Sequence, residues 1–138
     1  MLQKKLNFTL FLIMASSLKS PKRILIIDDN SSYVDVACEF LKESGVEAAG
    51  AGTTAVALEE MKKSPIDLVL LDISLEGEDG LAFLPKLKAL YPNVPVVMLT
   101  GHGYDNTMMR TAMASGATSY FSKENDLKDL VEMLERLV

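Results

Sequence analysis

Three aspartates, a threonine and a lysine stand where apolar runs of this sequence end. Asp28 and Asp29 directly follow the run RILII, and Asp72 directly follows LVLL. Thr100 follows VVML, and Lys123 follows SYFS. Carboxylates that bind a divalent cation, with a hydroxyl and an ammonium beside them, are the groups that phosphoryl transfer to an aspartate requires. This chemistry depends on whether the fold brings the five residues together.

The elements that would position these residues alternate along the chain. Apolar runs bounded by turn residues predict five buried strands, over Arg23–Ile27, Val46–Ala49, Leu68–Leu71, Val94–Leu99 and Thr118–Phe121. Amphipathic patterns with start and stop signals predict five helices, over Ser32–Ser44, Thr53–Lys63, Leu81–Tyr91, Tyr104–Ser115 and Asp126–Val138. Pro85 indicates that the third helix either begins near it or is kinked there, whereas Pro95 is tolerated near the start of a strand.

This alternation of strand and helix predicts the fold class. We expect an α/β domain with a doubly wound, five-stranded parallel sheet in the flavodoxin-like order 2-1-3-4-5 and helices on both faces. In that order a site forms at the carboxyl ends of the strands, between the first and the third. Each of the five polar residues alone is more typical of a turn, a cap, a solvated position or, for Thr100, a β-branched strand end. Together they should converge on this edge of the sheet.

Three carboxylates at one edge would repel one another. At about 4 Å and an effective dielectric constant of about 20, each pair of like charges costs about 4 kcal/mol. Lys123 alone cannot neutralise three acids, so either one acid is protonated or a cation binds. Hard oxygen ligands of this kind suit Mg²⁺. With Mg²⁺ bound, Asp72 would stay ionised and could act as a nucleophile towards phosphorus.

The composition limits the class of protein. The chain has 138 residues, enough for one domain, and 49% of them are hydrophobic, which excludes a disordered chain. A net charge of −5 makes it a poor binder of nucleic acid. The single cysteine, Cys38, cannot form an internal disulfide and is expected in the core of a cytoplasmic protein. Glycine-rich loops for dinucleotides or nucleoside triphosphates are absent from the sequence.

Residues 1–20 differ from the rest of the chain and are expected to be an N-terminal extension. They contain lysines near the start, an apolar run and then small residues, as a signal peptide does. The run is too short to span a bilayer. The segment could be an export signal, an upstream extension with the natural start at Met14, or an apolar arm that packs on this domain or a partner. We favour the last two, because the motifs belong to cytoplasmic chemistry.

From Lys22 to Val138 the sequence closely resembles the receiver domain of two-component response regulators, so residues 21–138 are assigned to such a domain. The motifs that carry the resemblance are ILIIDDN, LVLLDISLEGEDG, PVVMLTGHG and GATSYFSK, in that order. The resemblance implies that Asp72 accepts a phosphoryl group from a phosphohistidine on a sensor histidine kinase or a histidine phosphotransfer protein. It also implies that Mg²⁺ is bound by Asp29, Asp72 and the backbone carbonyl of Ser74, with Asp28 reaching it directly or through water.

The resemblance further implies a switch. Lys123 would pair with the phosphoryl group, the hydroxyl of Thr100 would turn towards it, and Tyr120 would swing inward. These movements would reset the surface formed by the fourth helix, the fifth strand and the fifth helix, which contacts a downstream protein target or effector domain. Such a domain is a signalling switch that assists its own phosphoryl transfer and dephosphorylation, and phosphorylation-linked homodimers are common among its relatives.

The sequence departs from the family pattern near the site. Glu124 follows Lys123 where receivers usually have proline, so a trans bond and a differently shaped loop are expected. Leu75-Glu76 replaces the usual Met-Pro. Ser74 and His102 occupy positions that tune hydrolysis of the aspartyl phosphate, and His102 is either a residue that orients or obstructs water or an exposed loop residue. Three methionines of the fourth helix are interpreted mainly as core residues, with a partner surface as the alternative: Met108, Met109 and Met113.

Two other functions are compatible with parts of the pattern. A hydrolase of the haloacid-dehalogenase type would also form an aspartyl phosphate, but it needs an acid two residues after the nucleophile, where this chain has Ser74. A receiver-like binding module that takes no phosphate is the second alternative. Whether the domain acts alone or belongs to a longer regulator is left open by the sequence.

Overall fold

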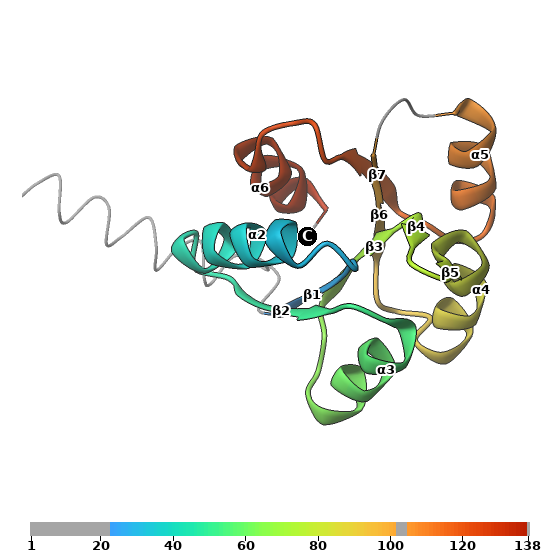
Figure 1. Ribbon diagram of the computed structural model, residues 1–138, viewed down its shortest axis with the longest axis horizontal. Helices are drawn as coiled ribbons and strands as arrows, with labels where there is room; N and C mark the ends of the chain where they lie inside the picture. The colour runs from blue at the N-terminus through green and yellow to red at the C-terminus, as the bar shows by residue number, and fades with distance from the viewer. Residues whose placement is uncertain (1–22, 102–104, 138) are drawn as a thin grey trace, which may run out of the picture.

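Five parallel strands form one sheet in the computed structural model, which describes residues 23–101 and 105–137 (Figure 1). The sheet has the order β2-β1-β3-β6-β7, so the predicted order 2-1-3-4-5 is confirmed. All four neighbouring pairs are parallel. The strands are β1 (Arg23–Ile27), β2 (Glu47–Ala51), β3 (Leu68–Asp72), β6 (Val96–Thr100) and β7 (Ser119–Ser122).

The central strands are apolar along their whole length because helices cover both of their faces. Every residue of β3 and β6 is buried, and β1 is buried from its second residue onward. The sequence of a strand that is buried on both faces is a continuous aliphatic run, without alternation of apolar and polar residues. The register aligns Ile27 with Leu71, and Asp72 with Leu99, so these strands end at nearly the same level. The polar residues that follow them are therefore delivered to one edge.

Two helical layers enclose the sheet. The apolar residues of α2 (Ser31–Glu43) and α6 (Leu127–Arg136) pack with one set of strand side chains. Those of α3 (Thr54–Lys63), α4 (Gly80–Leu90) and α5 (Asn106–Ala114) pack with the other set. Figure 1 shows α2 and α6 on one side of the sheet and the other three helices on the opposite side. The expectation of helices on both faces is thus confirmed.

Most helix starts follow from capping. The side chains of Asn30, Thr53, Asp79 and Asp105 accept hydrogen bonds from the first turns of α2, α3, α4 and α5. Of the two alternatives for Pro85, a helix that begins near it is excluded, because Asp79 caps α4 at Gly80 and Pro85 lies inside the helix. The predicted start of the next helix at Tyr104 lies outside the described residues, and α5 itself begins at Asn106.

A small antiparallel hairpin that the sequence did not predict follows β3. It consists of β4 (Ser74–Leu75) and β5 (Glu78–Asp79), with Gly77 at the turn in a left-handed conformation of φ 71°. The carboxylate of Glu78 accepts hydrogen bonds from the backbone N–H and the hydroxyl of Thr54, at the start of α3. The hairpin is therefore tied to a neighbouring helix beside the end of β3.

Some expectations concern parts of the chain that are not described. The N-terminal extension of residues 1–20, His102 and the last residue of the final helix lie outside the described residues. Within the described ranges, no helix combines the length and the apolar character that crossing a bilayer requires.

Candidate functional site

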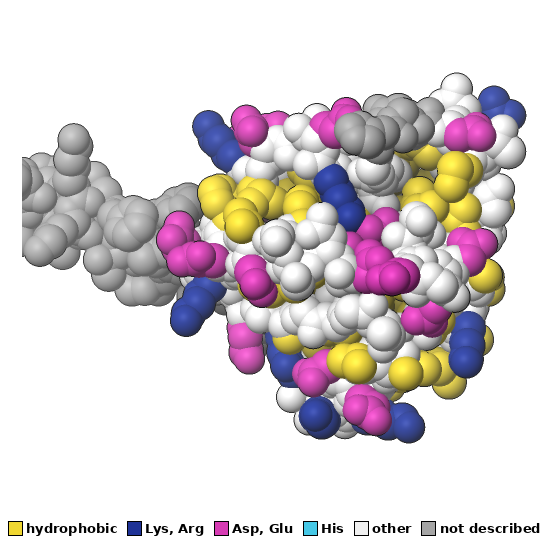
Figure 2. All heavy atoms as spheres, in the orientation of Figure 1, with side chains coloured by type: hydrophobic (Ala, Val, Ile, Leu, Met, Phe, Trp, Pro, Cys, Tyr) yellow, Lys and Arg dark blue, Asp and Glu magenta, His cyan; other side chains and the backbone are white. Residues whose placement is uncertain are grey.

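Three aspartates meet at the carboxyl edge of the sheet, as the sequence predicted. Asp28 and Asp29 directly follow β1, and Asp72 is the last residue of the adjacent strand β3. One carboxylate oxygen from each residue lies within 4.8 Å of those of the other two. Asp28 is 2% exposed and Asp72 is 6% exposed, whereas Asp29 faces solvent. Figure 2 shows acidic side chains gathered near the end of β1, with a basic side chain beside them.

Lys123 inserts its ammonium between two of these acids. Its Nζ lies 2.5 Å from Oδ2 of Asp28 and 2.5 Å from Oδ2 of Asp72. Its backbone N–H donates to the carbonyl of Thr100 at 2.9 Å, which fixes the loop after β7 to the end of β6. Burial alone would lower the pKa of Lys123, but the hydrogen bonds and charges of the two carboxylates outweigh it and raise the pKa. The lysine is therefore positively charged.

The surroundings of Asp28 destabilise the charged form of its carboxyl group. Burial raises its pKa, and the charge of Asp72 raises it further, although Lys123 and the N–H of Asn30 act in the opposite direction. Oδ1 accepts a hydrogen bond of 2.9 Å from that N–H. Oδ2 is buried, and the Lys123 ammonium lies 2.5 Å from it. This oxygen has capacity for a further positive partner.

The acidic cluster fits a hard divalent cation. Lys123 contacts two of the three carboxylates, and one oxygen from each of the three lies close enough for them to coordinate one ion together. Oxygen ligands of this kind are those that Mg²⁺ and Ca²⁺ take in proteins. The burial of Asp28 supports the same assignment, because a buried carboxylate is stabilised by a further positive charge beside it.

The hairpin after β3 orients two of the acids through its backbone. Oδ1 of Asp72 accepts a hydrogen bond of 2.9 Å from the N–H of Ser74. Oδ2 of Asp29 accepts one of 2.9 Å from the N–H of Glu76. Proline has no N–H, so the glutamate at this position allows a contact with Asp29 that the usual residue of the family could not make. The main chain at Glu76 therefore helps to orient Asp29.

Thr100 is the last residue of β6, and Tyr120 lies within the neighbouring strand β7. Thr100 is buried at the end of β6, and its hydroxyl donates to the carbonyl of Phe121 at 3.4 Å. Tyr120, on β7, is 38% exposed. The peptide bond after Lys123 is trans, like every bond in the described part of the chain, and the N–H of Glu124 donates to the hydroxyl of Ser122. The expected trans bond before Glu124 is confirmed.

The sequence did not predict a role for Tyr33, which lies in the first turn of α2. Its ring centroid lies 5.1 Å from Nζ of Lys123. Its hydroxyl is buried and accepts or donates no hydrogen bond among the described residues. The only signal in the sequence is an aromatic residue a little more than one helical turn after the acidic pair.

The three methionines of α5 differ in how far they are buried. Met109 is buried, as the core interpretation predicted, but Met108 and Met113 are exposed. Met109 and Met113 line a groove between α5 and β7, together with Asn106, Arg110 and Tyr120. For Met108 and Met113 the core interpretation is wrong, and the described surface offers them as contact residues.

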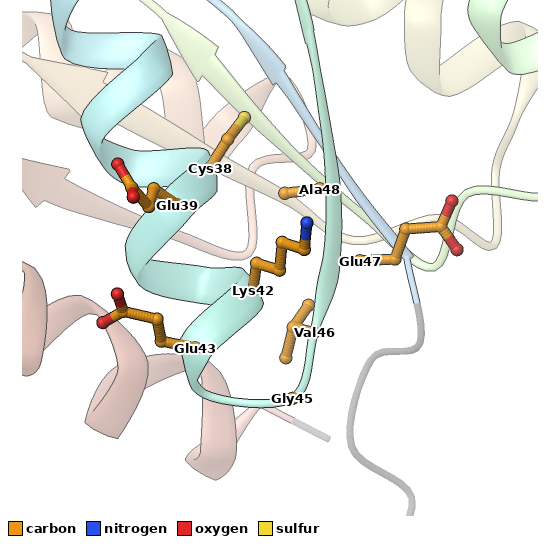
Figure 3. Close-up of a pocket in the computed structure, with 8 residues that line it drawn as sticks. All are labelled: Cys38, Glu39, Lys42, Glu43, Gly45, Val46, Glu47 and Ala48. Atoms are coloured by element: carbon orange, nitrogen blue, oxygen red, sulfur yellow. The ribbon is translucent and has the colours of Figure 1, made fainter.

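A second groove lies away from the acidic cluster, along the C-terminal half of α2 and the start of β2 (Figure 3). Its lining includes Cys38, Lys42 and Val46. Cys38 is partly buried rather than fully buried. Burial raises the pKa of its thiol, and the nearby charge of Asp35 raises it further. A raised pKa keeps the thiol protonated and unreactive, so this groove lacks an activated nucleophile.

The chain matches the family model of the response regulator receiver domain over residues 24–135. It is 34% identical over 113 residues to the transcriptional regulatory protein ZraR of Escherichia coli strain K12, covering 82% of this chain and 25% of ZraR. It is 31% identical over 119 residues to the phosphate regulon transcriptional regulatory protein PhoB of Klebsiella pneumoniae, covering 85% of this chain and 52% of PhoB. The chain therefore spans about a quarter and about half of these curated relatives.

Solved structures agree with these sequence similarities. The receiver domain of NtrX from Brucella abortus superposes with a TM-score of 0.76 at 34% identity, covering 82% of this chain and 95% of that one. A CheY-like receiver domain protein from Methanospirillum hungatei gives a TM-score of 0.78 at 30% identity, covering 86% and 94%. The similarities support neither the hydrolase alternative nor a module that takes no phosphate.

Proposed function

Because this chain belongs to the family of response regulator receiver domains, which are phospho-accepting signalling domains, we propose that Asp72 is its phosphoacceptor. The observation that carries the proposal is the position of Lys123, whose ammonium lies 2.5 Å from Asp72 and from Asp28 at the carboxyl edge of the sheet. A carboxylate beside a fixed positive charge is arranged to receive an electron-poor phosphorus atom and its negative oxygens.

The proposed donor is a phosphohistidine on a sensor histidine kinase or a histidine phosphotransfer protein. An oxygen of Asp72 attacks phosphorus, a P–O bond forms, and the P–N bond breaks with its electron pair left on the imidazole. Lys123 offsets negative charge on the phosphoryl oxygens, and the hydroxyl of Thr100 turns from the carbonyl of Phe121 to donate to one of them. In this proposal the domain assists its own phosphoryl transfer and dephosphorylation.

Mg²⁺ is the proposed metal, held by the side chains of Asp28, Asp29 and Asp72 and by the backbone carbonyl of Ser74. When bound, it would supply positive charge next to the phosphoryl oxygens. The chain's own contribution is to hold the carboxylates in place: the N–H groups of Asn30, Ser74 and Glu76 each donate to one of them.

The proposed output is a change of the surface formed by α5, β7 and α6. Movement of Thr100 towards the phosphoryl group vacates space next to β7, and Tyr120 turns inward to fill it, which alters the groove that it lines with Met113. A downstream protein or an effector domain would bind this surface, and a phosphorylation-linked homodimer is a further possible complex. A cytoplasmic location and a receiver domain over residues 21–138, preceded by an extension of residues 1–20, complete the proposal.

Intact-mass spectrometry tests the phosphoacceptor. After incubation with acetyl phosphate and Mg²⁺, we expect the wild-type mass to increase by one phosphoryl group. The adduct should be lost in Asp72→Asn, because the amide is not a nucleophile towards phosphorus. The matched control is Asp35→Asn, at an exposed position of α2, which should form the adduct as the wild type does.

Three outcomes would contradict the proposal. An adduct that persists in Asp72→Asn would move the phosphoacceptor to another residue. A wild-type protein that binds Mg²⁺ but forms no adduct would favour a module that takes no phosphate. Turnover of a small phosphomonoester that requires Asp72 would instead support the hydrolase alternative.

A further inference from the structure

Lys123 has a third neighbour besides the two carboxylates. The ring of Tyr33 lies under its ammonium, with 5.1 Å between Nζ and the ring centroid. The face of an aromatic ring attracts a cation at this range. Tyr33 is fixed from both ends, because its N–H donates to the side chain of Asn30 and its ring packs against the apolar cluster between α2, α6 and the sheet.

The ring differs from the carboxylates in one respect that matters for phosphoryl transfer. Asp28 and Asp72 bind the ammonium as anions, so each of them competes with the phosphoryl oxygens for it. Tyr33 is neutral: burial raises its pKa, and the opposing effect of Lys123 does not cancel this. A neutral ring face attracts the cation without forming an ion pair that must be broken. Its contact can persist while the anionic partners of Lys123 change.

The surroundings of Lys123 make such a support useful. The backbone of the loop is fixed by the N–H of Lys123 on the Thr100 carbonyl and the N–H of Asn125 on the Ser122 carbonyl. These hydrogen bonds fix the main chain, whereas the position of the long Lys123 side chain depends on the contacts of its ammonium group. Glu124, which follows, is exposed and offers none of the rigidity of a proline.

We propose that Tyr33 is a positioning residue, whose ring holds the Lys123 ammonium over Asp72 while the anions around it exchange. This inference rests on the proposed function, because its consequence is a faster phosphoryl transfer to Asp72. The hydroxyl takes no part, since it is buried without a hydrogen-bond partner among the described residues. The alternative is that Tyr33 only fills space, in which case any apolar side chain of similar size would serve.

Two substitutions separate these roles. Tyr33→Phe keeps the ring, and Tyr33→Leu keeps apolar bulk without it. With acetyl phosphate and Mg²⁺, we expect Tyr33→Leu to lower the rate of adduct formation about fivefold, which corresponds to about 1 kcal/mol. Tyr33→Phe should stay within about twofold of the wild type. The matched control is Tyr91→Leu, at a partly buried aromatic after α4, which should leave the rate unchanged.

A second measurement keeps the inference independent of phosphorylation. Protons near the end of the Lys123 side chain should show a ring-current shift in NMR spectra of the wild type and of Tyr33→Phe, and this shift should be lost in Tyr33→Leu. Urea unfolding of each variant shows whether a rate change follows from lost stability instead.

The outcomes are distinguishable. A wild-type rate in Tyr33→Leu, or a rate in Tyr33→Phe as low as that in Tyr33→Leu, would overturn the positioning role. Absence of the ring-current shift in the wild type would overturn the contact itself. Failure of the wild type to form an adduct, with the shift present, would contradict the proposed function and leave the contact established.

Discussion

At the scale of one residue, the buried charge of Asp28 lowers the stability of the fold at a position proposed to bind a metal ion. Its carboxylate is 2% exposed, it lies beside two other carboxylates, and burial raises its pKa. A raised pKa means that Asp28 binds a proton more tightly in the folded state than in the unfolded state. The contribution of Asp28 to the free energy of unfolding is therefore greatest at low pH and falls as the pH rises through its folded pKa. At neutral pH its charge opposes folding.

We expect Asp28→Asn to raise the free energy of unfolding by about 1 kcal/mol at pH 7 in the presence of a chelator. The amide has the same shape and carries no charge, while Lys123 keeps Asp72 as a partner. Added Mg²⁺ should stabilise the wild type by binding only the folded state, and it should have little effect on the variant. Urea titrations with EDTA and with MgCl₂ measure both effects.

Asp35→Asn, at an exposed position, is the control and should change stability by less than about 0.5 kcal/mol. If Asp28→Asn lowered stability in the chelator, the ion pair with Lys123 would outweigh the cost of burying the charge.

Sequence reasoning located single residues well where they end strands. Asp28, Asp29, Asp72 and Lys123 could be placed together because parallel strands bring their carboxyl ends to one edge. Tyr33 could not, because the direction of a helical side chain depends on how its helix packs. The backbone N–H of Glu76 could not either, since a main-chain donor leaves no mark in the sequence.

At the scale of an element, the hairpin after β3 depends on one glycine. Gly80 begins α4 and donates its N–H to the carbonyl of Ile73 at 2.8 Å. A Cβ at this position would lie 1.9 Å from the carbonyl oxygen of Asp72 and 2.9 Å from that of Ile73. Both neighbours are backbone atoms next to the proposed phosphoacceptor, so they cannot move aside without moving the site.

Gly80→Ala should therefore reduce the free energy of unfolding by about 1–3 kcal/mol and slow phosphorylation. The added methyl group forces the backbone of Asp72 or the start of α4 to shift. Chemical denaturation measures the first effect, and the rate of adduct formation with acetyl phosphate measures the second.

Gly52→Ala provides the matched control. A Cβ there has no atom within 4 Å, so stability should change by less than about 0.5 kcal/mol. Equal stability of the two alanine variants would mean that the backbone around Asp72 yields more easily than these distances indicate.

The sequence predicted the longer helices and strands but not the shortest strands. The five strands of the sheet and the five helices were found from their patterns, with ends that agree to within two residues where the structure describes them. The β4–β5 hairpin was missed because strands of two residues are too short to show a period. The third helix was predicted to within one residue at each end, and capping by Asp79 rather than Pro85 determines where α4 begins.

At the scale of the whole molecule, α2 and α6 form one helical layer although they lie near opposite ends of the described chain. Leu130 and Leu134 of α6 pack in the same cluster as Val34, Ala37 and Leu41 of α2. The last helix thus closes one face of the sheet, and it also flanks the surface proposed to carry the output. A substitution that weakens the packing of α6 should therefore affect both the free energy of unfolding and the proposed output surface.

Leu134→Ala should lower the free energy of unfolding by about 2–4 kcal/mol, because Leu134 is 3% exposed and its removal leaves a cavity. Leu90→Ala is the control: Leu90 is 55% exposed at the end of α4, and its loss should cost less than about 1 kcal/mol. Thermal and urea unfolding measure both variants. A small effect at Leu134 would show that α6 contributes little to the core.

The position of Lys123 has a consequence for the newly made protein. Asp28 follows the first described strand and Asp72 ends the third, but Lys123 follows β7, the last strand of the sheet. Ribosomes deliver a chain from its N-terminus, so the acids are synthesised well before the lysine. A nascent chain that has not yet exposed β7 holds the proposed phosphoacceptor without its cation. The proposed site is therefore complete only after β7 has been synthesised and has joined the sheet.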